Sequence, residues 1–111
     1  MWGICLNNRL PEGTLFQRVV EYRKIDENTV MTIQPVQDQK IDIQDVRPID
    51  KPPLYGYGDA VSVIDHPDRK GMIRDIIWHF ERNVFVYYLE MDGKKNKTRY
   101  TEEELVAETV S

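Results

Sequence analysis

Short apolar runs, each followed by a turn signal, organise the second half of the chain. They predict strands over residues 60–63, 72–80, 84–91, 96–100 and 105–107. Turns are predicted at 66–71, at 81–83 and at Asp92-Gly93, a dipeptide that suits the positive φ angles of a type I′ hairpin. Thr101 followed by three glutamates predicts a helical turn before the last strand. We expect the core of this half to consist of Val61, Val63, Ile73, Leu89 and Leu105.

The first half repeats this order of features weakly. Strands are predicted over 15–22, 29–33 and 40–43, with a hairpin at 37–39, and residues 44–48 correspond to 103–107. Gly13 takes the place of Gly71, 58 residues later in the chain. Few residue identities are shared, so the internal repeat rests on the order of elements.

The segment 15–22 has two interpretations, which the sequence leaves open. Residues 14–17 fit a capping box, and helical spacing connects Phe16, Val19, Val20 and Arg23. The β-branched pair Val19-Val20 and Tyr22 favour a strand.

A proline cluster divides the chain. Residues 48–53 contain three prolines, which remove backbone donors and favour a stiff linker. We therefore predict an N-terminal half, 1–50, and a C-terminal half, 51–111. Halves this small bury modest cores, so we expect them to pack on each other or the chain to form a homodimer.

Composition narrows the class of protein. The 111 residues are 41% hydrophobic and 31% charged, as in globular proteins. No apolar run approaches the roughly 20 residues that span a bilayer, and the start lacks the basic region of a signal peptide. With a single cysteine and a net charge of −4, we expect a soluble cytoplasmic protein without an internal disulfide.

Residues 55–107 resemble SH3-like barrels of the Tudor and KOW kind. The matching strings are Gly58-Asp59-x-Val61-x-Val63, Lys70-Gly71-x-Ile73, Tyr87-Tyr88-Leu89, Gly93-Lys94-Lys95 and Glu104-Leu105. The resemblance implies a mostly β fold of two tandem SH3-like five-stranded barrels, related by the weak repeat. The strings Trp78-His79, Tyr87-Tyr88-Leu89-Glu90 and Lys97-x-Arg99-Tyr100 are also similar to those of small uncharacterised bacterial proteins, a resemblance that implies no activity.

Aromatic residues concentrate in the second half. Tudor-like barrels can hold a methylated cation in an aromatic cage, and aromatic residues also fill the cores of small barrels. Both roles stay open here. The candidate partner-binding residues are Tyr57, Asp59, Trp78, Phe80, Tyr87 and Tyr88.

A basic stripe provides a second candidate surface. Lys95, Lys97 and Arg99 alternate along one predicted strand and so share a face. Such a face could read single-stranded nucleic acid with Tyr88 beside it, or it could be a solvated edge that prevents strand pairing. Residues 1–50 carry six basic and eight acidic groups, and residues 51–111 carry nine and eleven, so neither half has the positive excess of a duplex-binding domain.

The sequence contains no motif typical of a catalytic or metal site. Cys5, His66 and His79 lack a surrounding motif, and two histidines without paired cysteines do not predict zinc. We therefore expect no catalytic residues, no metal and no cofactor. The leading hypothesis is a non-catalytic module that binds a protein partner through barrel loops and aromatic surface. The alternative is a nucleic-acid-binding accessory protein that uses the Lys95/Lys97/Arg99 face.

Overall fold

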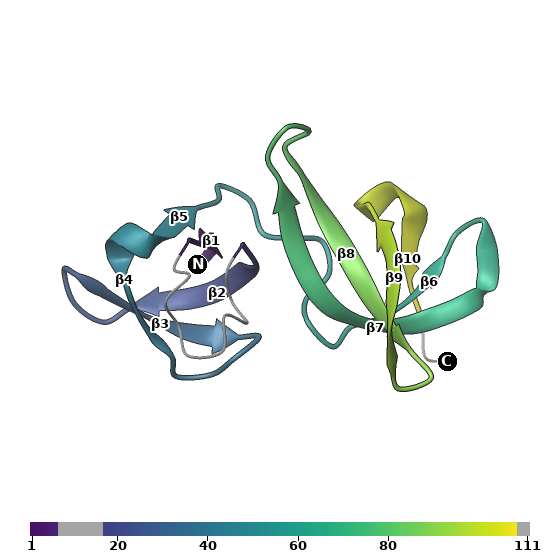
Figure 1. Ribbon diagram of the computed structural model, residues 1–111, viewed down its shortest axis with the longest axis horizontal. Helices are drawn as coiled ribbons and strands as arrows, with labels where there is room; N and C mark the ends of the chain where they lie inside the picture. The colour runs from purple at the N-terminus through teal and green to yellow at the C-terminus, as the bar shows by residue number, and fades with distance from the viewer. Residues whose placement is uncertain (7–16, 109–111) are drawn as a thin grey trace. The chain divides into compact units, whose positions relative to one another are not determined.

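The computed structural model describes residues 1–6 and 17–108 of the chain. The chain divides into two compact units, Met1–Pro52 and Pro53–Ser111 (Figure 1). Within the described residues each unit consists of β-strands and one 3₁₀ turn, without an α-helix. The fold is therefore mostly β, as the apolar patterns predict, and none of the described elements is a helix able to span a membrane.

The first unit is a five-stranded antiparallel sheet in the order β4-β3-β2-β1-β5. Its elements are β1 (Trp2–Cys5), β2 (Val19–Lys24), β3 (Thr29–Gln34), β4 (Lys40–Asp42), the 3₁₀ turn η1 (Ile43–Asp45) and β5 (Val46–Pro48). One core of buried side chains holds the strands together, formed by Cys5, Val20, Tyr22, Val30, Ile41 and Val46.

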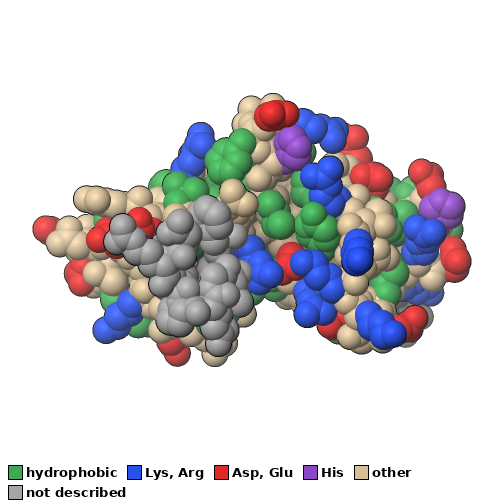
Figure 2. Space-filling model, viewed as in Figure 1, with side chains coloured by type: hydrophobic (Ala, Val, Ile, Leu, Met, Phe, Trp, Pro, Cys, Tyr) green, Lys and Arg blue, Asp and Glu red, His purple; other side chains and the backbone are tan. Residues whose placement is uncertain are grey.

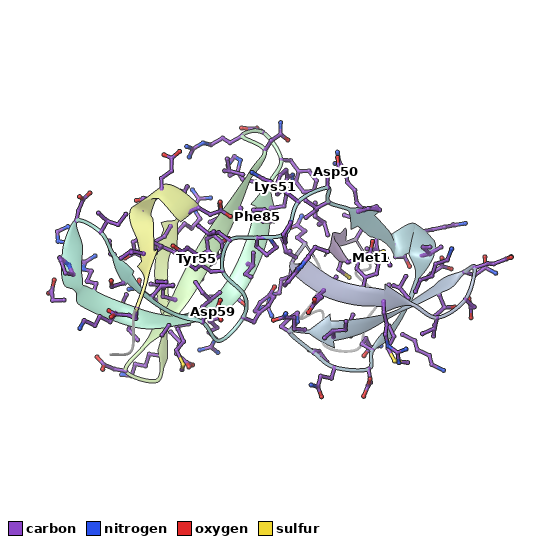
Figure 3. All side chains as sticks on the ribbon, turned by 180° about the vertical axis from the view of Figure 1, so that it is seen from behind. Met1, Asp50, Lys51, Tyr55, Asp59 and Phe85 are labelled. Atoms are coloured by element: carbon purple, nitrogen blue, oxygen red, sulfur yellow. The ribbon has the colours of Figure 1, made fainter. Side chains whose placement is uncertain are left out.

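The second unit is also a five-stranded antiparallel sheet, in the order β10-β6-β7-β8-β9. Its elements are β6 (Ala60–Val63), β7 (His66–His79), β8 (Val84–Met91), β9 (Lys94–Tyr100), the 3₁₀ turn η2 (Glu102–Glu104) and β10 (Leu105–Ala107). All five core residues predicted from the sequence are buried here: Val61, Val63, Ile73, Leu89 and Leu105. Tyr55 and Phe85 are buried with them (Figure 3).

The two units share one topology. In each, the first four strands follow one another across the sheet, and the fifth returns to pair with the first. The backbone bonds that end this closing pair also recur. Leu6 N–H donates to Asp45 O at 2.7 Å in the first unit, and Ile64 N–H donates to Glu104 O at 2.9 Å in the second.

A polar cap starts the 3₁₀ turn that precedes each closing strand. The Asp42 carboxylate accepts from the Gln44 N–H at 2.9 Å, and the Glu104 carboxylate accepts from the Thr101 N–H at 3.0 Å. These bonds satisfy donors that the short turn leaves open. The helical turn predicted at Thr101 is confirmed as this single 3₁₀ turn.

Several boundaries in the second unit differ from the sequence prediction. The predicted turn at 66–71 is wrong, because β7 begins at His66 and the chain reverses at residues 64–65. Val63 pairs with His66 and Ser62 with Lys70, so residues 67–69 form a bulge in the long strand. A bulge accommodates Pro67, which has no N–H to donate to the ladder. The Asp92-Gly93 hairpin is confirmed, with φ angles of 53° and 76°.

In the first unit, residues 15 and 16 and the proposed Gly13 equivalence lie outside the described residues. The helical alternative is wrong for residues 19–24, which form β2. The predicted strand 40–43 ends at Asp42, because that residue caps η1. The sequence did not predict β1, a four-residue strand without an alternating pattern.

The closed barrels implied by the resemblance are not observed. The pairings of the described residues give open sheets, with β4 and β5 at the edges of one and β9 and β10 at the edges of the other.

Candidate functional site

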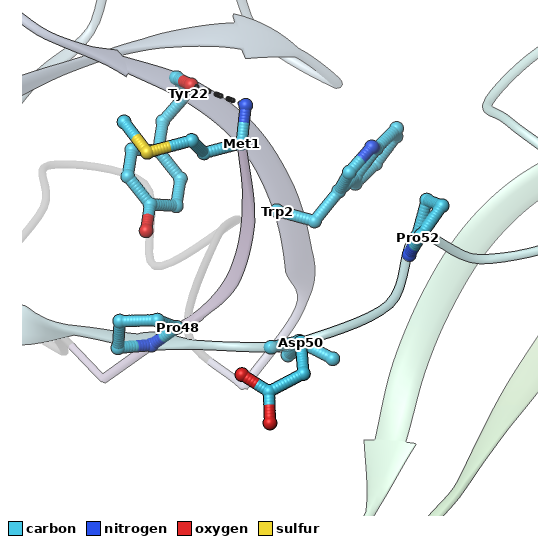
Figure 4. Close-up of a pocket in the computed structure, with 7 residues that line it drawn as sticks. Met1, Trp2, Tyr22, Pro48, Asp50 and Pro52 are labelled. Atoms are coloured by element: carbon cyan, nitrogen blue, oxygen red, sulfur yellow. Dashed lines mark hydrogen bonds between the residues drawn. The ribbon is translucent and has the colours of Figure 1, made fainter.

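The first unit contains a pocket where the start of the chain, β2 and the segment after β5 come together (Figure 4). Its volume is about 390 Å³, and it is lined by Met1, Trp2, Tyr22, Pro48, Ile49, Asp50 and Pro52. This volume lies within the range of pockets that hold small ligands or single side chains. We call it the Trp2 pocket.

Backbone hydrogen bonds position the walls of the Trp2 pocket. The Met1 ammonium donates to the Tyr22 carbonyl at 3.0 Å, and the Tyr22 N–H donates to the Met1 carbonyl at 2.8 Å. On the other side of β1, the Ile49 N–H donates to the Trp2 carbonyl at 3.0 Å. Trp2 is therefore held between β2 and the segment that follows β5.

Gly3 allows these strands to approach each other. A Cβ atom at Gly3 would lie 2.7 Å from Val46 Cγ1, 2.8 Å from the Arg47 carbonyl oxygen and 2.9 Å from Tyr22 Cε1. These distances are far shorter than ordinary carbon contacts of 3.5–4.0 Å. A residue without a side chain is thus required directly beside Trp2, and it brings Tyr22 and β5 together around the pocket.

The walls of the Trp2 pocket are mostly apolar. Tyr22 is buried, and burial raises the pKa of its phenol. Pro48 and Pro52 are rigid and have no N–H to donate. Within the described part of the chain, the Trp2 indole N–H has no hydrogen-bond partner and the Asp50 carboxylate has no ion pair. A bound ligand would therefore meet apolar walls and the indole N–H, whereas the exposed Asp50 carboxylate points away from Trp2 in Figure 4.

In the second unit, Tyr87 must be removed from the predicted partner-binding residues. Its side chain is fully buried, and its ring meets Tyr55 edge-on at 5.7 Å between centroids. The phenol donates to the Glu102 carboxylate at 2.8 Å. Burial, and then Glu102, raise the pKa of this phenol far above its usual range. Tyr87 fills the core because it faces inward from strand β8.

Four of the other candidates in the second unit have separate contacts or exposure. The Tyr57 hydroxyl donates to the Ile76 carbonyl at 3.3 Å, and Trp78 meets Phe85 edge-on at 5.0 Å between centroids. Phe80, in the turn that follows β7, is 43% exposed. The Asp59 carboxylate accepts from the Gly56 N–H at 2.7 Å, which stabilises a turn. None of these contacts joins two of the six candidate residues to each other.

The basic stripe is partly neutralised. Lys95 Nζ lies 2.8 Å from Asp75 Oδ2, and it also lies 4.9 Å from the centre of the Tyr88 ring. Asp75 is buried, so its carboxylate holds this lysine in place. Lys97 and Arg99 remain exposed on β9. On the face shown in Figure 2, lysine and arginine side chains are interspersed with acidic and hydrophobic ones.

The three residues considered for catalysis belong to different units. Cys5 is buried in the core of the first unit, whereas His66 and His79 belong to β7 of the second. His79 Nδ1 accepts from the Arg82 N–H at 3.2 Å at the β7–β8 hairpin. Among the residues that the structure describes, no group of three or more His, Cys, Asp or Glu side chains is placed to hold a metal ion.

The sequence analysis did not find the Trp2 pocket. Trp2 and Asp50 are far apart along the chain, and only the pairing of β1 with β2 and β5 brings their segments together. The available signal was a lone tryptophan in the first half and a proline cluster at its end.

Comparison with known proteins identifies a family. No curated protein and no solved structure matches this chain. A family model described as a family of unknown function, DUF6960, matches residues 6–106, which is most of the chain. The chain therefore belongs to the DUF6960 family.

Proposed function

We propose that this chain is a non-catalytic interaction module that binds a protein partner through the Trp2 pocket. The module consists of two SH3-like units in tandem. Their common strand order, and the 3₁₀ turn before each closing strand, support this relationship. We place the module in the bacterial cytoplasm, in keeping with its composition.

The Trp2 pocket is the observation that carries the proposal. Tryptophan and tyrosine are the residues most enriched among binding hot spots, because their large rings bury much area at little entropic loss. Trp2 provides such a ring, and the two prolines form walls that lose little freedom on binding. The indole N–H of Trp2, which has no hydrogen-bond partner among the described residues, supplies a polar group that can orient a ligand in a mostly apolar pocket.

Binding by strand addition is less well supported. A peptide that extends a sheet needs an open row of backbone donors and acceptors at an edge strand. The edge strand β5 ends in Pro48, which lacks an N–H, and β9 carries several lysines, a feature that discourages edge pairing. A pocket that receives side chains is therefore the better supported mode.

Nucleic-acid binding is also less well supported. Of the three residues proposed for that face, Lys95 is already engaged by Asp75 and Tyr88. The net charge of −4 opposes the approach of a polyanion.

The proposal is tested by selecting ligands from a displayed library of random 12-residue peptides with the full chain. We expect selected peptides to bind in the micromolar range in fluorescence anisotropy. Trp2→Ala should weaken this binding by about 30-fold, a loss of ~2 kcal/mol that is typical of a hot spot. Val36→Ala is the matched control, because Val36 is an exposed apolar residue of the same unit outside the pocket.

A second variant protects the test against misfolding. Trp2→Leu keeps an apolar side chain on β1 and removes the ring, and circular dichroism reports whether each variant keeps its β structure. Peptides that bind folded Trp2→Leu as tightly as the unmodified chain would overturn the pocket. Tight, salt-sensitive binding of single-stranded oligonucleotides, lost when Lys97 and Arg99 become glutamate, would favour the nucleic-acid alternative instead.

A further inference from the structure

We propose that strand β4 is a self-complementary edge at which two copies of this chain pair antiparallel, with Ile41 of one copy opposite Ile41 of the other. The occupant of this edge is a second copy of the chain, and the surface is distinct from the Trp2 pocket. The proposal follows from the register of β4, from the open backbone groups at its edge and from the opposite charges of Lys40 and Asp42.

The ladder between β3 and β4 determines which backbone groups of β4 point outward. Backbone hydrogen bonds of 2.9 Å join residue 39 to residue 32 and residue 43 to residue 28. Between them, Ile41 is the register partner of Val30. Hydrogen-bonded and non-hydrogen-bonded pairs alternate along an antiparallel ladder. The backbone groups of Lys40 and Asp42 therefore point away from β3, toward the edge of the sheet.

These outward groups are largely open within the described part of the chain. No described strand pairs with the outer edge of β4. The Lys40 carbonyl accepts only a long bond of 3.4 Å, from the side-chain amide of Gln39. The Asp42 carbonyl starts η1, where a cap residue accepts the first bond of the turn, but a carbonyl oxygen has a second lone pair. The edge can therefore still accept a strand.

The other three edges are less suited to a second copy. In β10 the outward Leu105 carbonyl accepts from the Tyr55 hydroxyl at 3.1 Å. In β5 the Val46 N–H donates to a carbonyl of η1, and Pro48 has no N–H. The charged side chains of β9 are all basic, so two copies of that strand would repel each other. Of the described edges, β4 is the one that remains both open and free of like charges.

The charges of β4 complement each other in this arrangement. Antiparallel pairing about Ile41 places Lys40 directly opposite Asp42 of the second copy, and the two-fold axis repeats the contact. Both side chains are exposed, and neither has an ion pair among the described residues. One oxygen of the Asp42 carboxylate accepts from the Gln44 N–H at 2.9 Å, which leaves the other for a lysine. Opposite charges directly across an antiparallel pair are stabilising, and like charges are destabilising.

The same register aligns the backbone groups. Each Asp42 N–H would donate to the Lys40 carbonyl of the second copy, and each Lys40 N–H would face the second lone pair of an Asp42 carbonyl. Only three residues from each copy form the edge, so the interface is small. We therefore expect a weak dimer, with a dissociation constant on the order of 0.1–1 mM.

Dilution of the ¹⁵N-labelled full chain from millimolar to micromolar concentration tests the edge. We expect concentration-dependent shifts of the amide resonances of residues 39–43, while those of β9 and β10 stay in place. In a mixture of labelled and unlabelled chains, isotope-filtered spectra should show contacts between Asp42 of one copy and Lys40 of the other. Shifts absent at millimolar concentration, or centred on a different edge, would overturn the proposal.

Two variants test the charges. Lys40→Glu places like charges opposite each other and should weaken the dimer about fivefold or more. Lys24→Glu is the matched control, because Lys24 is an exposed lysine of the same unit at the end of β2, and it should leave the dimer unchanged.

Asp42→Asn protects the test against misfolding, because asparagine caps a helical turn as well as aspartate does. It should weaken the dimer and abolish the salt dependence of the dissociation constant. Circular dichroism reports whether each variant keeps its β structure. A dissociation constant that folded Lys40→Glu leaves unchanged would overturn the proposal, without consequence for peptide binding at the Trp2 pocket.

Discussion

Replacing Gly3 by alanine is expected to destabilise the first unit and to damage the Trp2 pocket. The new methyl group would lie 2.7 Å from Val46 Cγ1, 2.8 Å from the Arg47 carbonyl oxygen and 2.9 Å from Tyr22 Cε1. One of these atoms is backbone, and Val46 and Tyr22 belong to the core, so little can move aside. Overpacking of this kind typically costs about 1–3 kcal/mol. For a unit of this size, each 1 kcal/mol lowers the melting temperature by roughly 4–8 °C.

Thermal and urea unfolding of the full chain, followed by tryptophan fluorescence and circular dichroism, measure this loss. Gly93→Asn is the control, because a side chain at Gly93 would meet no atom within 4 Å and asparagine tolerates a positive φ. It should leave stability within about 0.5 kcal/mol. A Gly3→Ala protein that unfolds within that same margin would show that β1, β2 and β5 are not packed as closely as described.

Three further predictions concern the second unit. Leu89→Ala should lower the free energy of unfolding by about 2–5 kcal/mol, because Leu89 is fully buried, and a loss below ~1 kcal/mol in urea unfolding would contradict the register of β8. Lys95→Met should lower the free energy of unfolding by about 1–3 kcal/mol, because the substitution removes an ion-pair partner of the buried Asp75. An unchanged unfolding midpoint would refute that role of Lys95. Burial raises the pKa of Tyr87, so its contribution to stability is full below the unfolded pKa near ~10 and declines at higher pH. Tyr87→Phe should flatten this alkaline decline in unfolding experiments, and an equally steep decline would show that the phenol is not buried.

Local patterns predicted much of the second unit. Strand β8 and strand β10 have the limits expected from their apolar runs, and the Asp92-Gly93 turn follows from the φ angles that these residues tolerate. The core residues were predictable for the same reason, since alternation fixes which side chains share a face. The prediction of a turn at 66–71 was wrong because a strand can hold a proline and a turn-like sequence within a bulge.

The candidate site was less predictable because it depends on contacts that are distant in sequence. Strand β1 is short and lacks alternation, and its position follows from pairing with β2 and β5. Without that pairing, Trp2 and Asp50 have no reason to line the same pocket. Tyr87 illustrates a second limit of prediction from the sequence. An aromatic residue suits a core and a binding surface equally well, and only the inward face of β8 assigns it to the core.

The central claim is that the Trp2 pocket binds a protein partner. The most direct measurement is the affinity of a library-selected peptide for the full chain and for folded Trp2→Leu, by fluorescence anisotropy under identical conditions. We predict micromolar binding that Trp2→Leu weakens by about tenfold or more and that the Val36→Ala control leaves unchanged. Equal affinities for the unmodified chain and for Trp2→Leu would contradict the claim.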